Sequence, residues 1–84
     1  MEDNTLDNLV VSVTGLGYVG LPIALAFSKK TKVIGFDIDE SRIELLKKSI
    51  DPTGEIPPIE FKGCDIKFTS DAEGLASANF HIVT

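Results

Sequence analysis

The stretch that decides the fold is "VVSVTGLGYVGLPIALAF", residues 10–27. It opens with apolar and β-branched residues, a pattern typical of a strand buried on both faces of a parallel sheet. Three glycines with the spacing G-x-G-x-x-G follow, and an apolar segment of helical period comes after them. The stretch carries no charged residue, although glycine turns of this spacing often hold an anion. The order of strand, glycine turn and helix is that of the first half of a βαβ unit.

Strands and helices alternate along the rest of the chain. We expect the chain to form strands over 9–14, 32–38, 66–70 and 79–84, helices over 18–30, 39–50 and 70–78, and a loop over 51–65 with one turn at 59–61. This alternation predicts an α/β fold, a partial Rossmann-type parallel sheet of four strands in the order 3-2-1-4 with flanking helices.

Two helices carry more detailed expectations. In the first, the apolar period predicts a buried face of Val19, Ile23, Ala26 and Phe27, widened by Leu21, Ala24 and Leu25. The third helix opens with Ser70 three residues before Glu73, the spacing of a capping box.

Length and composition limit the classes of protein. With 84 residues the chain is at most one domain, which we divide into a polar tail at 1–8 and a truncated Rossmann-type unit at 9–84. The net charge of -5 and the scattered basic residues argue against a nucleic acid partner. No apolar run approaches the ~18 residues of a membrane span. The single cysteine excludes an internal disulfide, and we expect a cytoplasmic protein.

The glycines gain meaning from the acidic residue that follows the second expected strand. Asp37 comes 22 residues after Gly15, which agrees with the spacing of about 20 in dinucleotide-binding units. Gly15 would allow a tight turn, Gly17 the approach of a diphosphate, and Gly20 close packing of helix on strand. Backbone N–H groups at the helix start, around Gly17, Tyr18 and Val19, would meet the phosphates without a lysine.

Asp37 predicts the cofactor as well as its place. Its carboxylate would accept hydrogen bonds from the adenosine ribose and repel a 2'-phosphate, so we predict NAD rather than NADP. Arg42 would flank the adenosine. The alternatives at this point are a glycine turn without a ligand, Asp37 as a cap of the second helix, and Arg42 as a solvated helix residue.

The sequence offers no catalytic residue and no metal ligands. His81 is the only histidine, and it lies in the fourth expected strand without a nearby carboxylate in sequence. Cys64 lies in a loop, with no histidine or basic cluster near it to lower its pKa.

The segments "GLGYVGLPIALAFSKK", "KVIGFDIDESRIELLKKSIDPTGE" and "IKFTSD" resemble the amino-terminal part of the UDP-glucose/GDP-mannose dehydrogenase family. The likeness covers residues 9–84 and is greatest to the bacterial UDP-N-acetylhexosamine 6-dehydrogenases of the Vi-antigen and capsule biosynthesis type. It implies an enzyme that oxidises the C6 hydroxyl of a UDP-sugar to a carboxylate. The resemblance further implies that two hydrides pass to two NAD molecules, one after the other. The sugar is bound to a cysteine, as a thiohemiacetal and then as a thioester, during this oxidation.

The resemblance also implies a set of cofactor-binding residues and a homo-oligomeric parent enzyme. The set comprises Gly15, Leu16, Gly17, Tyr18, Val19, Gly20, Asp37, Arg42 and Thr84. The family's catalytic cysteine motif and sugar site are absent, and Cys64 does not match that motif. We therefore expect residues 9–84 to be the truncated NAD-binding Rossmann domain of a dehydrogenase, an inactive fragment. Two alternatives remain, a nucleotide-sensing Rossmann module without catalysis and a β-hydroxyacid dehydrogenase.

Overall fold

The computed structural model describes residues 9–84, so the predicted polar tail at 1–8 lies outside the described residues. The elements in chain order are β1 (Val10–Thr14), α1 (Gly20–Ser28), β2 (Lys32–Phe36), α2 (Glu40–Lys47), the 3₁₀ helix η1 (Pro58–Phe61), β3 (Ile66–Thr69), the 3₁₀ helix η2 (Ala72–Ser77) and β4 (Phe80–Val83). Neither α-helix is long enough to cross a membrane, and the described residues contain no other α-helix.

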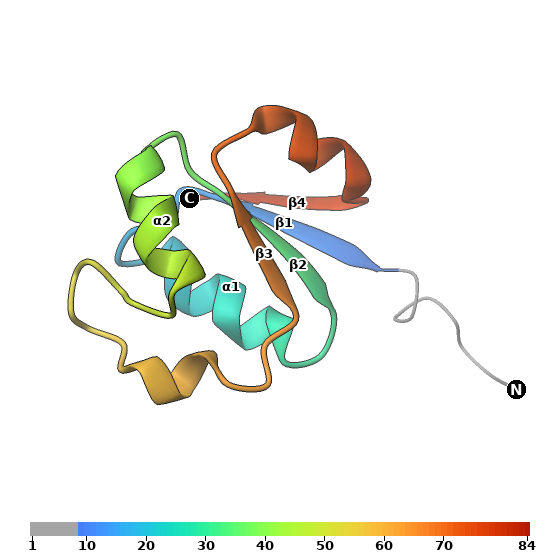
Figure 1. Ribbon diagram of the computed structural model, residues 1–84. Coiled ribbons are helices and arrows are strands. Elements are labelled where there is room, and N and C mark those ends of the chain that lie inside the picture. The colour runs from blue at the N-terminus through green and yellow to red at the C-terminus, as the bar shows by residue number, and fades with distance from the viewer. Residues whose placement is uncertain (1–8) are drawn as a thin grey trace, which may run out of the picture.

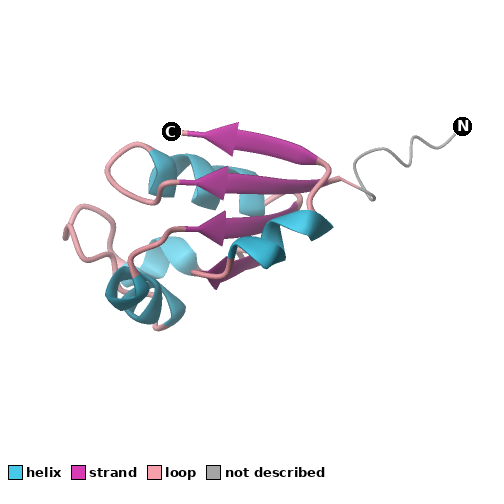
Figure 2. Cartoon of the chain, turned by 90° about the horizontal axis from the view of Figure 1, so that it is seen from above, coloured by secondary structure: helices cyan, strands magenta, loops and turns pink. Residues whose placement is uncertain are grey.

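The four strands form one parallel sheet in the order β3-β2-β1-β4, which confirms the predicted topology. Figure 2 shows the arrows side by side and pointing the same way, so that all carboxyl ends share one edge of the sheet. The helices α1 and α2 lie on one side of the sheet and η2 on the other (Figure 1). This arrangement follows from right-handed crossovers, because the chain moves outward through β1, β2 and β3 and then returns to β4.

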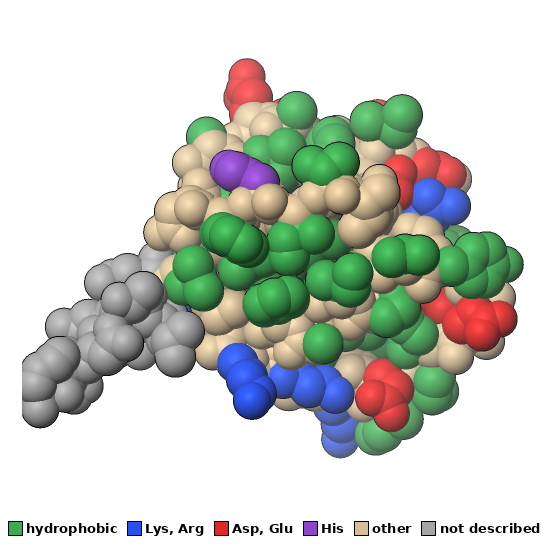
Figure 3. All heavy atoms as spheres, turned by 180° about the vertical axis from the view of Figure 1, so that it is seen from behind, with side chains coloured by type: hydrophobic (Ala, Val, Ile, Leu, Met, Phe, Trp, Pro, Cys, Tyr) green, Lys and Arg blue, Asp and Glu red, His purple; other side chains and the backbone are tan. Residues whose placement is uncertain are grey.

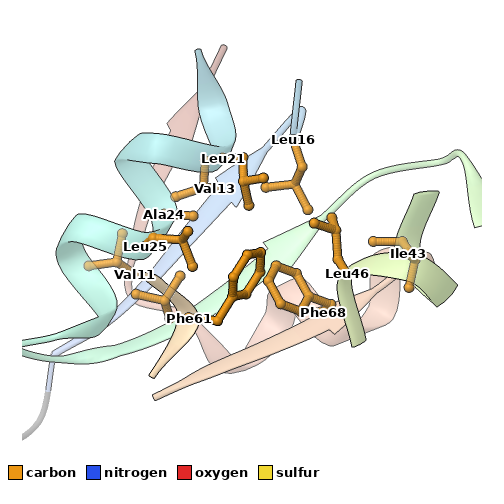
Figure 4. Packing of buried hydrophobic residues seen from close by; sticks show 11 residues of the cluster. Val11, Val13, Leu16, Leu21, Ala24, Leu25, Ile43, Leu46, Phe61 and Phe68 are labelled. Atoms are coloured by element: carbon orange, nitrogen blue, oxygen red, sulfur yellow. The ribbon is translucent and has the colours of Figure 1, made fainter. Parts of the chain in front are cut away.

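The main core lies between the sheet and the helices α1, α2 and η1 (Figure 4). Alternate residues of β1, Val11 and Val13, face it together with Leu21 and Leu25 of α1, and all four are at most 4% exposed. Because strand side chains alternate between faces, Ser12 points to the η2 side, where its Oγ hydrogen-bonds His81 Nδ1 of β4. His81 lies in β4, which confirms its predicted place in the fourth strand, and its ring is bonded to a side chain of the neighbouring strand.

The first helix differs from the expectation in its start and in its buried face. It begins at Gly20, because the preceding residues form a turn that is closed by the hydrogen bond from Leu21 N–H to the Gly17 carbonyl. The buried positions are Gly20, Leu21, Ala24, Leu25 and Ser28. The predicted face is confirmed at Leu21, Ala24 and Leu25, and Ile23 packs against the core. It was wrong at its other members, since Val19 and Phe27 are 64% and 39% exposed and Ala26 is exposed as well. Since the helix is apolar nearly all round, its period could not select the face that packs.

The expected helix at 70–78 is a 3₁₀ helix over Ala72–Ser77. Its cap is Asp71, whose side chain accepts a hydrogen bond from the Glu73 N–H, so the predicted capping box at Ser70 was wrong. The middle of the element is held close to β3, because a Cβ on Gly74 would lie 3.2 Å from Cγ2 of Thr69. The turn expected at 59–61 is confirmed as η1, and the second helix is capped by Asp39, which accepts from the Arg42 N–H.

The loop after α2 is organised around one buried carboxylate, that of Asp51. Its oxygens accept hydrogen bonds from the N–H groups of Thr53, Glu55 and Ile56 and from the Thr53 hydroxyl. Burial opposes ionisation of Asp51, but the bonds from Thr53, Ile56 and Glu55 outweigh it and hold its pKa below the ordinary value. The carboxylate thus replaces regular secondary structure as the partner of this backbone.

We expect Asp51→Ala to lower the free energy of unfolding by about 2 kcal/mol at pH 7, because it leaves several loop N–H groups without their acceptor. Urea unfolding measures the change, and Asp65→Ala, which removes an exposed carboxylate, is the matched control. The stabilisation exists above the unfolded-state pKa and disappears as the pH falls through the lower folded-state pKa. The gap between wild type and Asp51→Ala should therefore narrow below about pH 4, and a gap that stays constant down to pH 3 contradicts this role.

Candidate nucleotide-binding site

The glycine turn after β1 begins at Gly15, whose φ of +92° lies in the region that favours glycine. Its N–H donates to the Phe36 carbonyl at 2.9 Å, which ties the turn to the end of β2. On the other side, Thr84 follows β4 and donates from Oγ1 to the Gly15 carbonyl at 2.8 Å. A Cβ on Gly15 would lie 2.8 Å from this hydroxyl oxygen. The turn is thus held between the carboxyl ends of β2 and β4, the two strands that flank β1.

The other two glycines of the motif differ in their surroundings. A Cβ on Gly20 would lie 1.6 Å from the Gly15 carbonyl oxygen, so the start of α1 rests directly on the turn. At Gly17 a Cβ would meet nothing within 4 Å, because this residue faces open space. Gly20 is therefore required for packing, whereas the protein itself gives no steric reason for Gly17.

Three N–H groups directly after Leu16 have no acceptor among residues 9–84. Among the hydrogen bonds of the described residues, none is donated by the backbone of Gly17, Tyr18 or Val19. Their side chains do not enclose them, since Tyr18 and Val19 are 70% and 64% exposed. Unpaired N–H groups at the start of a helix carry partial positive charge and attract anions.

Asp37 directly follows β2 and is 7% exposed. Its Oδ2 accepts from the Leu16 N–H at 2.9 Å and from Arg42 NH1 at 3.0 Å, and its Oδ1 accepts from the Asp39 N–H at 2.9 Å. Burial opposes ionisation of this carboxyl, but the bonds from Leu16, Asp39 and Arg42 lower its pKa below the ordinary value. Asp37 is therefore ionised at neutral pH and lies beside the glycine turn.

Arg42 reaches this site from the first turn of α2. Its side chain is 31% exposed and forms the ion pair with Asp37, so it is not the solvated helix residue of the alternative interpretation. Its Nε is buried and has no hydrogen-bond partner among the described residues. Asp39, rather than Asp37, supplies the side-chain cap of α2, which removes the second alternative.

One open groove of about 700 Å³ brings the predicted residues together at the carboxyl ends of β1, β2 and β4. All nine members of the predicted set line it: Gly15, Leu16, Gly17, Tyr18, Val19, Gly20, Asp37, Arg42 and Thr84. Leu16 contributes only backbone to the arrangement, because its side chain is buried in the core and its N–H is bonded to Asp37.

Sequence reasoning missed three apolar residues that also line the groove, Ile23, Ile82 and Val83. Val83 is 77% exposed and ends β4 beside the turn. The parallel topology could have identified Ile82 and Val83, since β4 beside β1 must end next to the glycine turn. They add an apolar wall to a groove whose other side carries N–H groups and charges.

The remaining reactive side chains lie away from the groove. Cys64 is a free cysteine whose Sγ lies 3.5 Å from the Glu60 carbonyl oxygen and near the core residues of η1. His81 is bonded to Ser12, as described above. Among residues 9–84, no group of three or more histidine, cysteine, aspartate or glutamate side chains is placed to hold a metal ion.

Parallel topology, a glycine turn with unpaired N–H groups and an ionised carboxylate at the end of β2 define a dinucleotide-binding domain of the Rossmann class. Residues 9–83 match the NAD-binding domain of the UDP-glucose/GDP-mannose dehydrogenase family. The chain belongs to this family, as the resemblance of its motifs predicted.

Two curated relatives illustrate the likeness. The protein CapL of Staphylococcus aureus is 51% identical over 76 residues, which cover 90% of this chain and 18% of CapL. The UDP-N-acetyl-D-glucosamine 6-dehydrogenase of Pseudomonas aeruginosa is 45% identical over 80 residues, which cover 94% of this chain and 19% of the relative. The chain thus spans about a fifth of the length of these proteins.

Solved structures agree with the fold. The UDP-D-ManNAc dehydrogenase of Pyrococcus horikoshii superposes with a TM-score of 0.77 at 28% identity, over 90% of this chain and 20% of that one. The UDP-glucose dehydrogenase of Pyrobaculum islandicum also gives a TM-score of 0.77, at 22% identity, over 100% of this chain and 21% of that one. The family match favours the nucleotide-sugar dehydrogenase prediction over the β-hydroxyacid dehydrogenase and nucleotide-sensor alternatives.

Proposed function

We propose that the groove at the glycine turn binds the adenosine diphosphate half of NAD. The unpaired N–H groups of Gly17, Tyr18 and Val19 would meet the diphosphate, and Asp37 would accept hydrogen bonds from the adenosine ribose. Arg42 would flank the adenosine, and Thr84 would close the turn from the β4 side. The observation that supports this most is the combination at Gly17 of unused N–H donors and open space above the backbone.

We further propose that the whole protein is an NAD-dependent UDP-sugar 6-dehydrogenase of the capsule polysaccharide type. Support comes from the relative of Pseudomonas aeruginosa, whose name states oxidation at C6 of UDP-N-acetyl-D-glucosamine. Bound NAD supplies the hydride acceptor. The chain described here would hold and orient it, and the residues that act on the sugar would lie in other parts of the protein. On this proposal residues 9–84 are one truncated unit of the NAD-binding domain and are inactive alone.

We expect the purified chain to bind NAD and ADP-ribose with similar affinity, because the contacts assigned to it involve the adenosine diphosphate half. Asp37→Ala should weaken both by about tenfold or more, the effect of losing hydrogen bonds to a charged group. Isothermal titration calorimetry measures the affinities. Asp65→Ala, which removes a carboxylate at the amino end of β3, is the matched control and should bind as the wild type does. Equal affinity of the wild type and Asp37→Ala for NAD and ADP-ribose contradicts the role of Asp37. Absence of binding of either ligand by the wild type contradicts the cofactor site itself.

For the whole protein we also propose a cytoplasmic location and a homo-oligomeric state. The single free cysteine is compatible with a reducing compartment. Hydrophobic side chains gather on the face of the molecule seen in Figure 3. Large apolar residues such as Phe27 and Phe80 are 39% and 53% exposed, and β4 lies at an edge of the sheet. Such surfaces favour association. On this proposal the rest of the domain covers part of them, so the homo-oligomeric state rests on the resemblance to the family, and sedimentation of the whole protein tests it.

A further inference from the structure

Two consecutive N–H groups anchor the glycine turn to the end of β2, and they use different acceptors. The Gly15 N–H donates to the Phe36 carbonyl, an ordinary continuation of the sheet ladder. The next one, of Leu16, donates to the side chain of Asp37 at 2.9 Å. The next three N–H groups, those of Gly17, Tyr18 and Val19, have no acceptor among the described residues. The peptide held by Asp37 is therefore the last fixed one before the proposed phosphate donors.

The carboxylate that holds this peptide is itself fixed. Asp37 is 7% exposed, and the Asp39 N–H and Arg42 NH1 bind it at 2.9 and 3.0 Å. Leu16 is anchored from its other end as well, because its side chain is 1% exposed in the core. The direction of the Leu16 peptide is thus determined by the core on one side and by Asp37 on the other. A rotation of this peptide would turn the N–H groups that follow it.

From these contacts we infer that Asp37 positions the phosphate-binding turn, in addition to its proposed contact with the ribose. This inference rests on the proposed function and adds a coupling to it. One carboxylate thus connects the phosphate part and the ribose part of the proposed site. Its Oδ2 accepts from the Leu16 N–H of the turn, and the ribose hydroxyls would donate to the same carboxylate. Asp37 acts on the diphosphate through Leu16, so for that part of the ligand it is a positioning residue.

A ligand without ribose hydroxyls distinguishes the positioning role of Asp37 from a direct contact with the ribose. ADP and 2',3'-dideoxy-ADP carry the same diphosphate, but only ADP can bond to Asp37. We expect Asp37→Asn to weaken 2',3'-dideoxy-ADP by about tenfold, a loss typical of one misplaced charge-assisted hydrogen bond. The asparagine keeps the shape, but it has one acceptor oxygen in place of two, and its NH₂ group only donates, so it cannot replace the carboxylate that accepts from both the Leu16 and Asp39 N–H groups. Electrostatics alone predicts the opposite, since removal of a negative charge favours an anionic ligand.

Calorimetric titration of the purified chain with both nucleotides decides the matter. Asp39→Asn is the matched control, because it neutralises a carboxylate two residues away that caps α2 and does not touch the turn. Its affinity for 2',3'-dideoxy-ADP should equal that of the wild type. If Asp37→Asn also binds 2',3'-dideoxy-ADP as the wild type does, the positioning role is overturned while the nucleotide site stands. If the wild type binds neither nucleotide, the proposed function and this inference both fail.

A second measurement needs no variant, so it holds even if Asp37→Asn does not fold. The Leu16 amide proton reports on the bond to Asp37 in NMR spectra of the wild type. Ribose hydroxyls that donate to Asp37 compete with the Leu16 N–H for the same carboxylate and change the strength of its hydrogen bond. We therefore expect different Leu16 amide chemical shifts in the complexes with ADP and with 2',3'-dideoxy-ADP. Identical shifts in the two complexes would overturn the coupling.

Discussion

Gly20→Ala is expected to lower the free energy of unfolding by about 3 kcal/mol or more, as overpacking against a fixed backbone does. The added Cβ would lie 1.6 Å from the Gly15 carbonyl oxygen and 2.9 Å from Thr84 Oγ1. Neither the turn nor the helix can yield alone, because Thr84 also donates to the Gly15 carbonyl. A chain of this length has a total stability of roughly 4 to 13 kcal/mol, so the change removes a large part of it.

Gly17→Ala is the matched comparison within the same motif. Its Cβ meets no atom within 4 Å and its φ is not in the left-handed region, so the free energy of unfolding should stay within about 0.5 kcal/mol of the wild type. The methyl group instead enters the space proposed for the diphosphate. We expect at least about a tenfold loss of affinity for ADP, since a methyl group in the way of charge-assisted hydrogen bonds costs 1.4 kcal/mol or more.

Urea unfolding and ADP titration of both variants test the pair. We expect Gly20→Ala to lower the free energy of unfolding and Gly17→Ala to lower the affinity for ADP. A Gly20→Ala protein as stable as the wild type would show that helix and turn relax independently. A Gly17→Ala protein that binds ADP normally would show that the diphosphate does not approach this residue.

Asp37→Ser is expected to raise the ratio of NADP to NAD affinity by about 100-fold, which corresponds to about 2.7 kcal/mol. In the wild type the ionised Asp37 holds Arg42 through an ion pair of 3.0 Å, and on the proposed function it would face the ribose. Removal of the carboxylate takes away the repulsion of a 2'-phosphate and releases the guanidinium. The buried Nε of Arg42, which has no hydrogen-bond partner among residues 9–84, would then donate to the 2'-phosphate, the kind of acceptor that arginine binds best.

The ratio is the proper readout, because loss of the Leu16 anchor should weaken both dinucleotides equally. Competition of NAD and NADP for the chain measures it. In the double variant Asp37→Ser with Arg42→Met, most of the gain should disappear, since the guanidinium is gone. An unchanged ratio in Asp37→Ser contradicts the role of the carboxylate, and an equal gain in the double variant contradicts the role of Arg42.

Much of the candidate site could be predicted because it depends on backbone rules. The spacing from Gly15 to Asp37 counts the residues needed to pass through a turn, a helix and the next strand, so it indicated that the two would meet. The structure brings them together through the bond from the Leu16 N–H. Ile82 and Val83 could not be predicted as groove residues from their own segment, because only the pairing of β4 with β1 brings them beside the turn.

The sequence by itself determined the strand order and the glycine turn, because alternating apolar segments and glycines at 15, 17 and 20 act through local geometry. It could not determine which face of α1 is buried, since apolar residues surround the helix and period alone has no preference. The tertiary structure decided that face by seating Gly20 on the Gly15 carbonyl, a contact that fixes the rotation of the helix. The tertiary structure likewise decided that Asp37 holds the turn. The Leu16 N–H comes within hydrogen-bond distance of this carboxylate only because β1 pairs with β2.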